Sequence, residues 1–219
     1  MPRLCFEKKG NAIWLSHLDL MRLFQRAFKR AGLPLKHSNG FSPRPMLSIA
    51  LPLSVGIESY CEILDFELDC VTLTADQILL KLNDALISGV RVLSVYDSGR
   101  PLRELTYLNC QLSLEYDEGI PEHAQEAIIA LLSSDTLLVE KHSKNGTTMQ
   151  DIIPLIKRFS VDRIDSHTLV LFTCIHCQNP TLNPMQVASA ISTMLPEYRP
   201  DFFKISRLEA LDDTDSLFQ

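Results

Sequence analysis

The chain has 219 residues, of which 46% are hydrophobic and 22% are charged, and its formal net charge is −6. This composition is typical of a globular protein that buries a sizeable core, and the length suits one large domain or two of about 100 residues each. No stretch has the apolar length of a signal peptide or of a membrane-spanning helix, so we expect a cytoplasmic protein without membrane contact.

The six cysteines are irregularly spaced, and several lie in apolar runs, at positions 5, 61, 70, 110, 174 and 177. We therefore expect reduced, mostly buried thiols. No three of them have the close spacing that holds an iron–sulfur cluster. Cys174 and Cys177 have the spacing of a metal or redox pair, but no second pair accompanies them. A structural role is therefore favoured, and neither a metal nor another cofactor is predicted.

Charge is distributed unevenly along the chain. Residues 1–50 contain nine basic and two acidic residues, a balance of +7, whereas the remainder contains twelve basic and twenty-five acidic residues, a balance of −13. Such asymmetry fits a face that binds phosphates or an acidic partner, and it fits a solvated helix surface equally well.

The first hundred residues alternate between strand and helix patterns. β-rich runs predict strands at 3–8, 12–15, 46–53, 60–69 and 90–97, and helical spacing of apolar residues predicts helices at 17–31 and 75–87. Ser16 with Asp19, and Thr74 with Gln77, have the spacing of capping boxes. The order strand, helix, strand, strand, helix, strand is that of the split βαβ, or ferredoxin-like, arrangement.

The same order partly recurs in the second half. Strands are expected at 105–116, 136–142, 158–164, 168–176 and 201–211, with helices from Pro121 to about 133 and after the capping residue Asn183. Residues 143–157 are an insertion relative to the first half. We therefore predict an α+β protein of two ferredoxin-like halves, 1–100 and 101–211, which can pack as one pseudo-repeated unit. The acidic tail 212–219 is expected to be frayed.

Helix 17–31 has one apolar and one basic face. A helical wheel places the apolar side chains Leu20, Met21, Phe24, Ala27, Phe28 and Ala31 on the core side. The opposite face carries Arg22, Arg26, Lys29 and Arg30, with Asp19 positioned to pair with Arg22. A solubilising helix surface accounts for this pattern, and a phosphate-binding surface is the functional alternative.

His17 stands at the first helical position but points toward the apolar side. The free backbone N–H groups at a helix start suit an anion, so His17 is a candidate for anion binding. A half-buried structural histidine is the alternative.

The loop "KHSNGFSPRPMLS", residues 36–48, is the most unusual segment. Pro43 and Pro45 bracket Arg44 and favour an extended backbone there, and Asn39-Gly40 supplies a turn. An arginine held in this way loses little entropy when it binds a phosphate or a carboxylate, and Phe41 adds an aromatic ring. A rigid crossover with an incidentally exposed arginine is the structural alternative.

The stretches "LSHLDLMRLFQRAFKRAGLP" and "HSNGFSPRPMLSIALPLSVGIES" make the chain similar to the radical SAM-linked protein family, a bacterial domain family. The similarity is close over residues 3–69 and looser beyond them. The positions that match the family pattern are Ser16, His17, Asp19, Arg22, Arg26, Gly40, Phe41, Pro43, Arg44, Pro45, Gly56, Glu58 and Ser59. Ser42 and Asn39 depart from it.

The resemblance implies a partner more than a reaction. Members are typically encoded beside, or fused to, a radical SAM protein with a cobalamin-binding-like region. This chain lacks the cluster cysteines, so it resembles the stand-alone accessory form. The matching positions without an evident capping or backbone reason are the predicted binding residues: His17, Arg22, Arg26, Phe41, Arg44 and Glu58.

Three functions follow as hypotheses. The first is a non-catalytic accessory protein that binds RNA, or an RNA-modifying radical SAM partner, through the basic N-terminal surface; DNA is not expected. The second is a purely protein–protein adaptor of the radical SAM enzyme. The third is an enzyme with His17 as general base, oriented by Asp19 or Glu58. We further predict that Arg44 and His17 line one cationic pocket.

Overall fold

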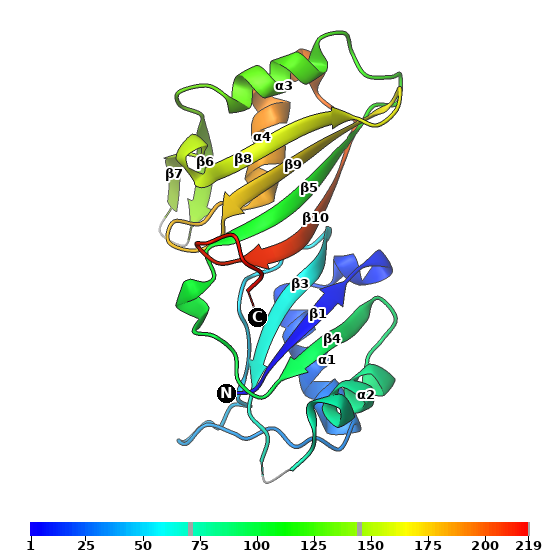
Figure 1. Ribbon diagram of the computed structural model, residues 1–219, viewed down its shortest axis with the longest axis vertical. Coiled ribbons are helices and arrows are strands. Elements are labelled where there is room, and N and C mark those ends of the chain that lie inside the picture. The colour runs from blue at the N-terminus through cyan, green and yellow to red at the C-terminus, as the bar shows by residue number, and fades with distance from the viewer. Residues whose placement is uncertain (70–71, 144–145, 219) are drawn as a thin grey trace. The chain divides into compact units, whose positions relative to one another are not determined.

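The computed structural model describes residues 1–69, 72–143 and 146–218. The chain divides into two compact units: the first unit contains Met1–Glu104 and Phe218, and the second unit contains Leu105–Leu217. Each unit combines helices with antiparallel strands (Figure 1), so the predicted α+β class is confirmed. In the described ranges no helix combines the length and the apolar character that crossing a bilayer requires.

The first unit contains β1 (Arg3–Lys8), η1 (Gly10–Trp14), α1 (His17–Arg30), β2 (Leu47–Ile49), β3 (Ile57–Phe66), α2 (Ala75–Ala85), β4 (Val90–Tyr96) and η2 (Leu102–Glu104). Its strands pair in the order β4–β1–β3–β2, and every neighbouring pair is antiparallel. Helix α1 thus connects β1 to the edge strand β2, and α2 connects β3 to the opposite edge strand β4.

The helix boundaries follow from local hydrogen bonds. Both predicted capping boxes are confirmed, because Ser16 accepts from the backbone of Asp19 and Thr74 accepts from that of Gln77. The apolar face of α1 packs on the sheet, where the rings of Phe6 and Phe24 lie 4.7 Å apart at their centroids. This packing turns the basic face of α1 to solvent, as the helical wheel predicts.

The prediction of a strand at 12–15 is wrong, because this segment lies largely within the 3-10 helix η1. The ammonium group of the fully buried Lys8 donates to the carbonyl oxygens of Ile13 at 3.0 Å and Leu15 at 3.3 Å. Gly10, at φ +56°, allows the chain to turn back toward Lys8. A side chain from β1 therefore binds carbonyl groups that a strand would offer to a neighbouring strand.

The second unit contains β5 (Tyr107–Glu115), α3 (Ala124–Leu132), β6 (Leu138–Ser143), β7 (Gly146–Asp151), η3 (Ile153–Leu155), β8 (Ile156–Arg163), β9 (Thr168–His176), α4 (Pro184–Met194), η4 (Pro196–Tyr198) and β10 (Phe202–Leu211). Its main sheet has the order β10–β5–β9–β8, again antiparallel throughout. If β6 and β7 are set aside, the order of elements and of paired strands is the same as in the first unit.

The strand predicted at 136–142 does not join that main sheet. It forms β6, which pairs only with β7 in a separate two-stranded sheet. The inserted structure therefore starts before the predicted 143–157, and it contains β6, β7 and η3. Periodicity within a strand cannot identify its pairing partner, which explains this error.

The expectation of a frayed tail is also wrong in the described residues. The backbone N–H groups of Thr214 and Ser216 donate to the carboxylate of the buried Asp212. Phe218 is 5% exposed and packs in the first unit, where the guanidinium carbons of Arg3 and Arg100 lie 5.4 and 5.3 Å from its ring centroid. The last described residues are thus anchored by a turn and by cation–π contacts.

The five described cysteines are free thiols, and those of the second unit are buried, as expected for a reduced chain. Cys70 lies outside the described residues. Within residues 1–69, 72–143 and 146–218, no three His, Cys, Asp or Glu side chains gather in a metal-binding arrangement.

Candidate functional site

The exposed face of α1 carries three cations at helical spacing. Arg22, Arg26 and Lys29 are all exposed, and consecutive members lie about 4.5–6 Å apart along the axis. Arg22 pairs with Asp19 at 3.6 Å, as predicted. The Ser16 hydroxyl lowers the pKa of the Asp19 carboxyl by hydrogen bonding, so this carboxylate stays ionised beside the helix start.

Arg30 does not belong to this row. Its guanidinium donates to the carbonyl oxygen of Ala85 at the end of α2. It therefore links the two helices of the first unit.

Residues 37–45 form a small hairpin that projects from the first unit. His37 and Pro45 make an antiparallel bridge, and the backbone N–H of Ser38 donates to the carbonyl oxygen of Arg44 at 2.8 Å. The backbone N–H of Arg44 donates to the hydroxyl of Ser38 at 3.1 Å. Phe41, in the turn, is fully exposed. The loop is thus rigid at its base and presents the side chains of Phe41 and Arg44 to solvent.

The hairpin lies beside the C-terminal half of α1. Its base residues His37 and Pro45 line the same cavity, of about 500 Å³, as Gln25 and Lys29 of the helix. The base of the hairpin therefore lies beside the Lys29 end of the cationic row of α1. We call Arg22, Arg26, Lys29, Arg44 and the ring of Phe41 the basic surface.

Within the described residues, the structure does not bring His17 and Arg44 into one pocket. His17 begins α1, whereas the hairpin packs near Lys29, about 18 Å further along the axis at 1.5 Å per residue. His17 is half-buried, and its Nδ1 has no hydrogen-bond partner in the described part of the chain. The length of α1 separates the two groups.

Glu58 also lies away from the basic surface. Its carboxylate accepts from the backbone N–H of Gly10 at 3.2 Å and from the hydroxyl of Tyr60 at 3.4 Å. These contacts stabilise the turn before η1, which gives Glu58 a structural role. Of the six predicted binding residues, Arg22 and Arg26 share the exposed face of α1, and Phe41 and Arg44 lie on the hairpin whose base is beside Lys29. His17 lies at the start of α1, and Glu58 lies on β3.

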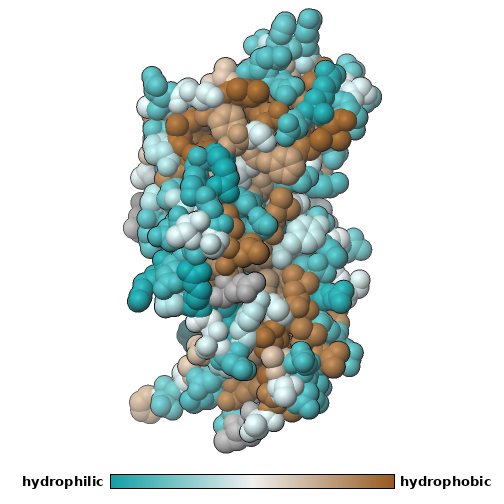
Figure 2. Space-filling view, in the orientation of Figure 1, coloured by the Kyte–Doolittle hydropathy of each residue, from teal (hydrophilic) through white to brown (hydrophobic). Residues whose placement is uncertain are grey.

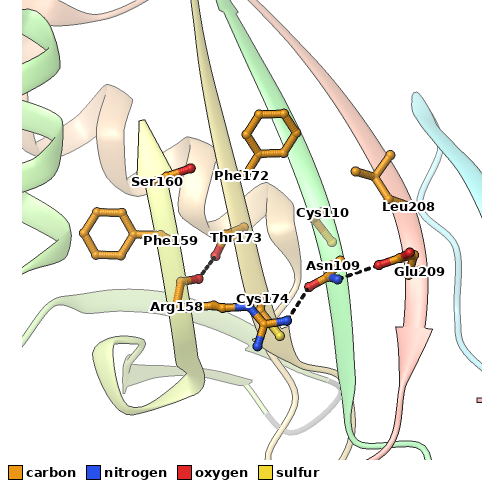
Figure 3. A pocket seen from close by; sticks show the side chains of 10 residues that line it. All are labelled: Asn109, Cys110, Arg158, Phe159, Ser160, Phe172, Thr173, Cys174, Leu208 and Glu209. Atoms are coloured by element: carbon orange, nitrogen blue, oxygen red, sulfur yellow. Dashed lines mark hydrogen bonds between the residues drawn. The ribbon is translucent and has the colours of Figure 1, made fainter. Parts of the chain in front are cut away.

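A second candidate lies on the sheet of the second unit, and it is not among the residues predicted from the sequence. A hollow of about 540 Å³ opens on this sheet (Figure 3), with lining residues that include Asn109, Arg158, Ser160, Phe172, Cys174 and Glu209. Over β8 and β9, hydrophobic and hydrophilic side chains are intermixed at the surface (Figure 2).

Hydrogen bonds order the polar side of this hollow. The amide nitrogen of Asn109 donates to a carboxylate oxygen of Glu209 at 2.7 Å, and Arg158 donates to the amide oxygen of Asn109 at 3.4 Å. Arg158 and Lys157 both pair with Asp215, and their hydrogen bonds lower the pKa of its carboxyl. Burial raises the pKa of the Cys174 thiol.

The sequence indicates the polar face of β5 at this hollow, but it does not indicate the exposed ring on β9. In β5, apolar residues alternate with Asn109, Gln111 and Ser113, which indicates one polar sheet face. In β9 the run "TLVLFTCIH" is almost continuously apolar, so the exposure of Phe172 cannot be read from it.

Comparisons with known proteins agree with this architecture at the level of the fold. A chain in the crystal structure of a Cbf5-Nop10-Gar1 complex is similar over 95% of this chain, with a TM-score of 0.50 and 8% sequence identity. The present chain spans about half of that chain, 48% of its length. No curated protein matches the sequence.

The sequence also matches a family model. The model is described as an uncharacterized protein conserved in bacteria (DUF2344), and it matches residues 2–184, most of the chain. The protein therefore belongs to the DUF2344 family.

Proposed function

We propose that the protein is a non-catalytic accessory protein that binds RNA through the basic surface. The observation that carries this proposal is that the row of exposed cations on α1 ends beside the base of the hairpin 37–45, since Lys29 lines one cavity with His37 and Pro45. Clustered lysines and arginines bind phosphates irrespective of base sequence. An exposed aromatic ring beside them can stack on an unpaired base.

The individual side chains fit this role. Arg26, Lys29 and Arg44 form no ion pair within the described residues, so their charges are available to a ligand. Phe41 has no core to fill at the tip of the hairpin, and burying its ring on RNA removes apolar area from water. The bracketing prolines limit the backbone freedom that Arg44 loses on binding.

The test is binding of a structured RNA pool at different salt concentrations. Four phosphate contacts predict a slope of roughly −3 in log K against log salt, which is roughly a 50-fold loss or more between about 50 and 200 mM. The double variant Arg26→Ala/Arg44→Ala should reduce that slope by about 1.5. Lys81→Ala/Arg91→Ala is the matched control, because it removes two exposed cations of the same unit outside the basic surface.

Two results contradict the proposal. One is that no structured RNA binds at low salt. The other is that the control variant weakens binding as much as Arg26→Ala/Arg44→Ala, because the basic surface would then contribute only its share of the net charge.

A second candidate function is the docking of a protein partner, and an apolar cluster at the start of α1 favours it. Trp14 is 66% exposed, Leu18 is 64% exposed and Val55 is also exposed. Exposed tryptophan and arginine are enriched among the residues that dominate binding at protein interfaces. The family resemblance makes a radical SAM protein the proposed partner. Co-purification of such a protein, without RNA, would favour this candidate.

We also propose a topology for the two units and a cellular compartment for the protein. We assign a ferredoxin-like topology to both units, on the strength of the order β4–β1–β3–β2 in the first and β10–β5–β9–β8 in the second. The cytoplasm is the proposed compartment, in keeping with the free thiols of the described cysteines.

A further inference from the structure

One face of the main sheet in the second unit carries no helix. Helices α3 and α4 pack on the other face, where Leu112 and Leu171 are fully buried (Figure 1). Side chains alternate along β9, so Phe172 points to the bare face, and it is 39% exposed between the buried Leu171 and Thr173. The hollow described above opens on this bare face.

We infer that this hollow binds an unpaired guanine base of an RNA strand; the inference rests on the proposed RNA-binding function and adds a second contact to it. Phe172 lies on an interior strand, between Gln111 of β5 and Ser160 of β8. Its direct partners on both neighbouring strands are thus polar residues. An aromatic ring presented in this way on a sheet is a stacking platform for a base.

Polar groups that line the same hollow as Phe172 select the type of base. The exposed carboxylate of Glu209 already accepts one hydrogen bond from Asn109, and its two oxygens keep further lone pairs. Guanine offers two adjacent N–H groups on its Watson–Crick edge, which match a carboxylate in a bidentate arrangement. Adenine and uracil present no such pair of donors. A volume of about 540 Å³ accommodates a base with its sugar.

The charges around the hollow favour a base over a small free anion. Arg158 and Lys157 share the carboxylate of Asp215, and Glu209 adds a second negative charge. The four charges balance, so an isolated phosphate gains little there. A neutral base that stacks and donates hydrogen bonds gains the most, while Arg158, half exposed at its side chain, can still reach the phosphate of the bound nucleotide.

The experiment measures binding of the RNA pentamers UUGUU and UUAUU to the full-length chain by fluorescence anisotropy. Phe172→Leu keeps apolar bulk but removes the ring face, and it should weaken UUGUU binding about 5- to 150-fold. Phe172→Trp keeps an aromatic ring and should therefore retain the binding of UUGUU. Glu209→Gln should reduce the preference for UUGUU over UUAUU by about tenfold. Phe202→Leu, which changes another exposed phenylalanine of the second unit outside the hollow, should have no effect.

Photo-crosslinking with a thioguanosine pentamer locates the base. We expect the label on the tryptic peptide 164–204, which contains Phe172. Label confined to the peptide 37–81, which contains the hairpin, overturns the inference and leaves the proposed function intact. So does binding of structured RNA without any binding of the pentamers. If neither kind of RNA binds, both fail. A preference for UUGUU that survives Glu209→Gln refutes the assignment of guanine.

Discussion

The replacement of Lys8 by methionine should destabilise the first unit selectively. Lys8 is 0% exposed, and its ammonium group donates to the carbonyl oxygens of Ile13, Leu15 and Ser54 at 3.0, 3.3 and 3.4 Å. Methionine has a similar length but no donor. The variant Lys8→Met therefore fills the space of the lysine side chain but removes the hydrogen-bond donor to these carbonyl groups.

The expected loss follows from the geometry. Only the 3.0 Å contact lies within the usual range for a strong hydrogen bond, and the other two are long. If one full and two weakened charge-assisted bonds are counted, the free energy of unfolding should fall by about 3 kcal/mol. For a unit of this size that moves the urea midpoint by roughly 1.5–3 M.

The assay is urea unfolding followed by tryptophan fluorescence. Trp14 is the only tryptophan of the chain, and it stands between Ile13 and Leu15, so it reports on this region. Lys81→Met is the control, because Lys81 of the same unit is exposed; a surface substitution of this kind changes the free energy of unfolding by about 0.5 kcal/mol at most. A Lys8→Met variant that unfolds within about 0.5 kcal/mol of the parent protein would refute the reasoning.

Two further predictions concern the same unit. Gly89→Ala should lower the free energy of unfolding by at least about 2 kcal/mol more than Gly10→Ala in the same assay. Gly89 has φ +87°, and an added Cβ would lie 2.5 Å from the carbonyl oxygen of Lys9, whereas a Cβ at Gly10 meets open space. Equal losses in the two variants would contradict this prediction. Burial raises the pKa of the Cys5 thiol from 9.0 to about 11. The stability of the folded state is therefore unaffected by this thiol's ionisation below pH 9, and it falls as the pH rises from 9 through about 11, where the unfolded chain loses the proton first. The free energy of unfolding should therefore fall by up to about 3 kcal/mol over that range, and Cys5→Ala should flatten the decline; an unchanged decline in Cys5→Ala would count against burial as its cause.

Local features of the structure follow directly from the sequence. The ends of α1 and α2 depend on side chains three residues apart, Ser16 with Asp19 and Thr74 with Gln77, so spacing alone identifies them. The two faces of α1 follow from a helical period that needs no knowledge of the sheet. The basic surface was thus predictable in its helical part.

Contacts between different structural elements decided the remainder. The chain at 12–15 forms η1 because Lys8, from another element, binds its carbonyl groups. Glu58 resembled a binding residue until its contact with Gly10 gave it a structural role. Neither contact leaves a trace in local periodicity, since each joins residues whose proximity arises only after the chain has folded.

The sequence by itself determined the class of the protein, the order of its elements and the solvent-facing cations of α1, because capping and amphipathic period act over a few neighbouring residues. Only the tertiary structure decided that the hairpin packs near Lys29 rather than near His17, and that Phe172 emerges on a bare sheet face. The physical reason is that strand pairing and helix packing are set by contacts between residues far apart in the chain, and burial is a property of those contacts rather than of any residue type.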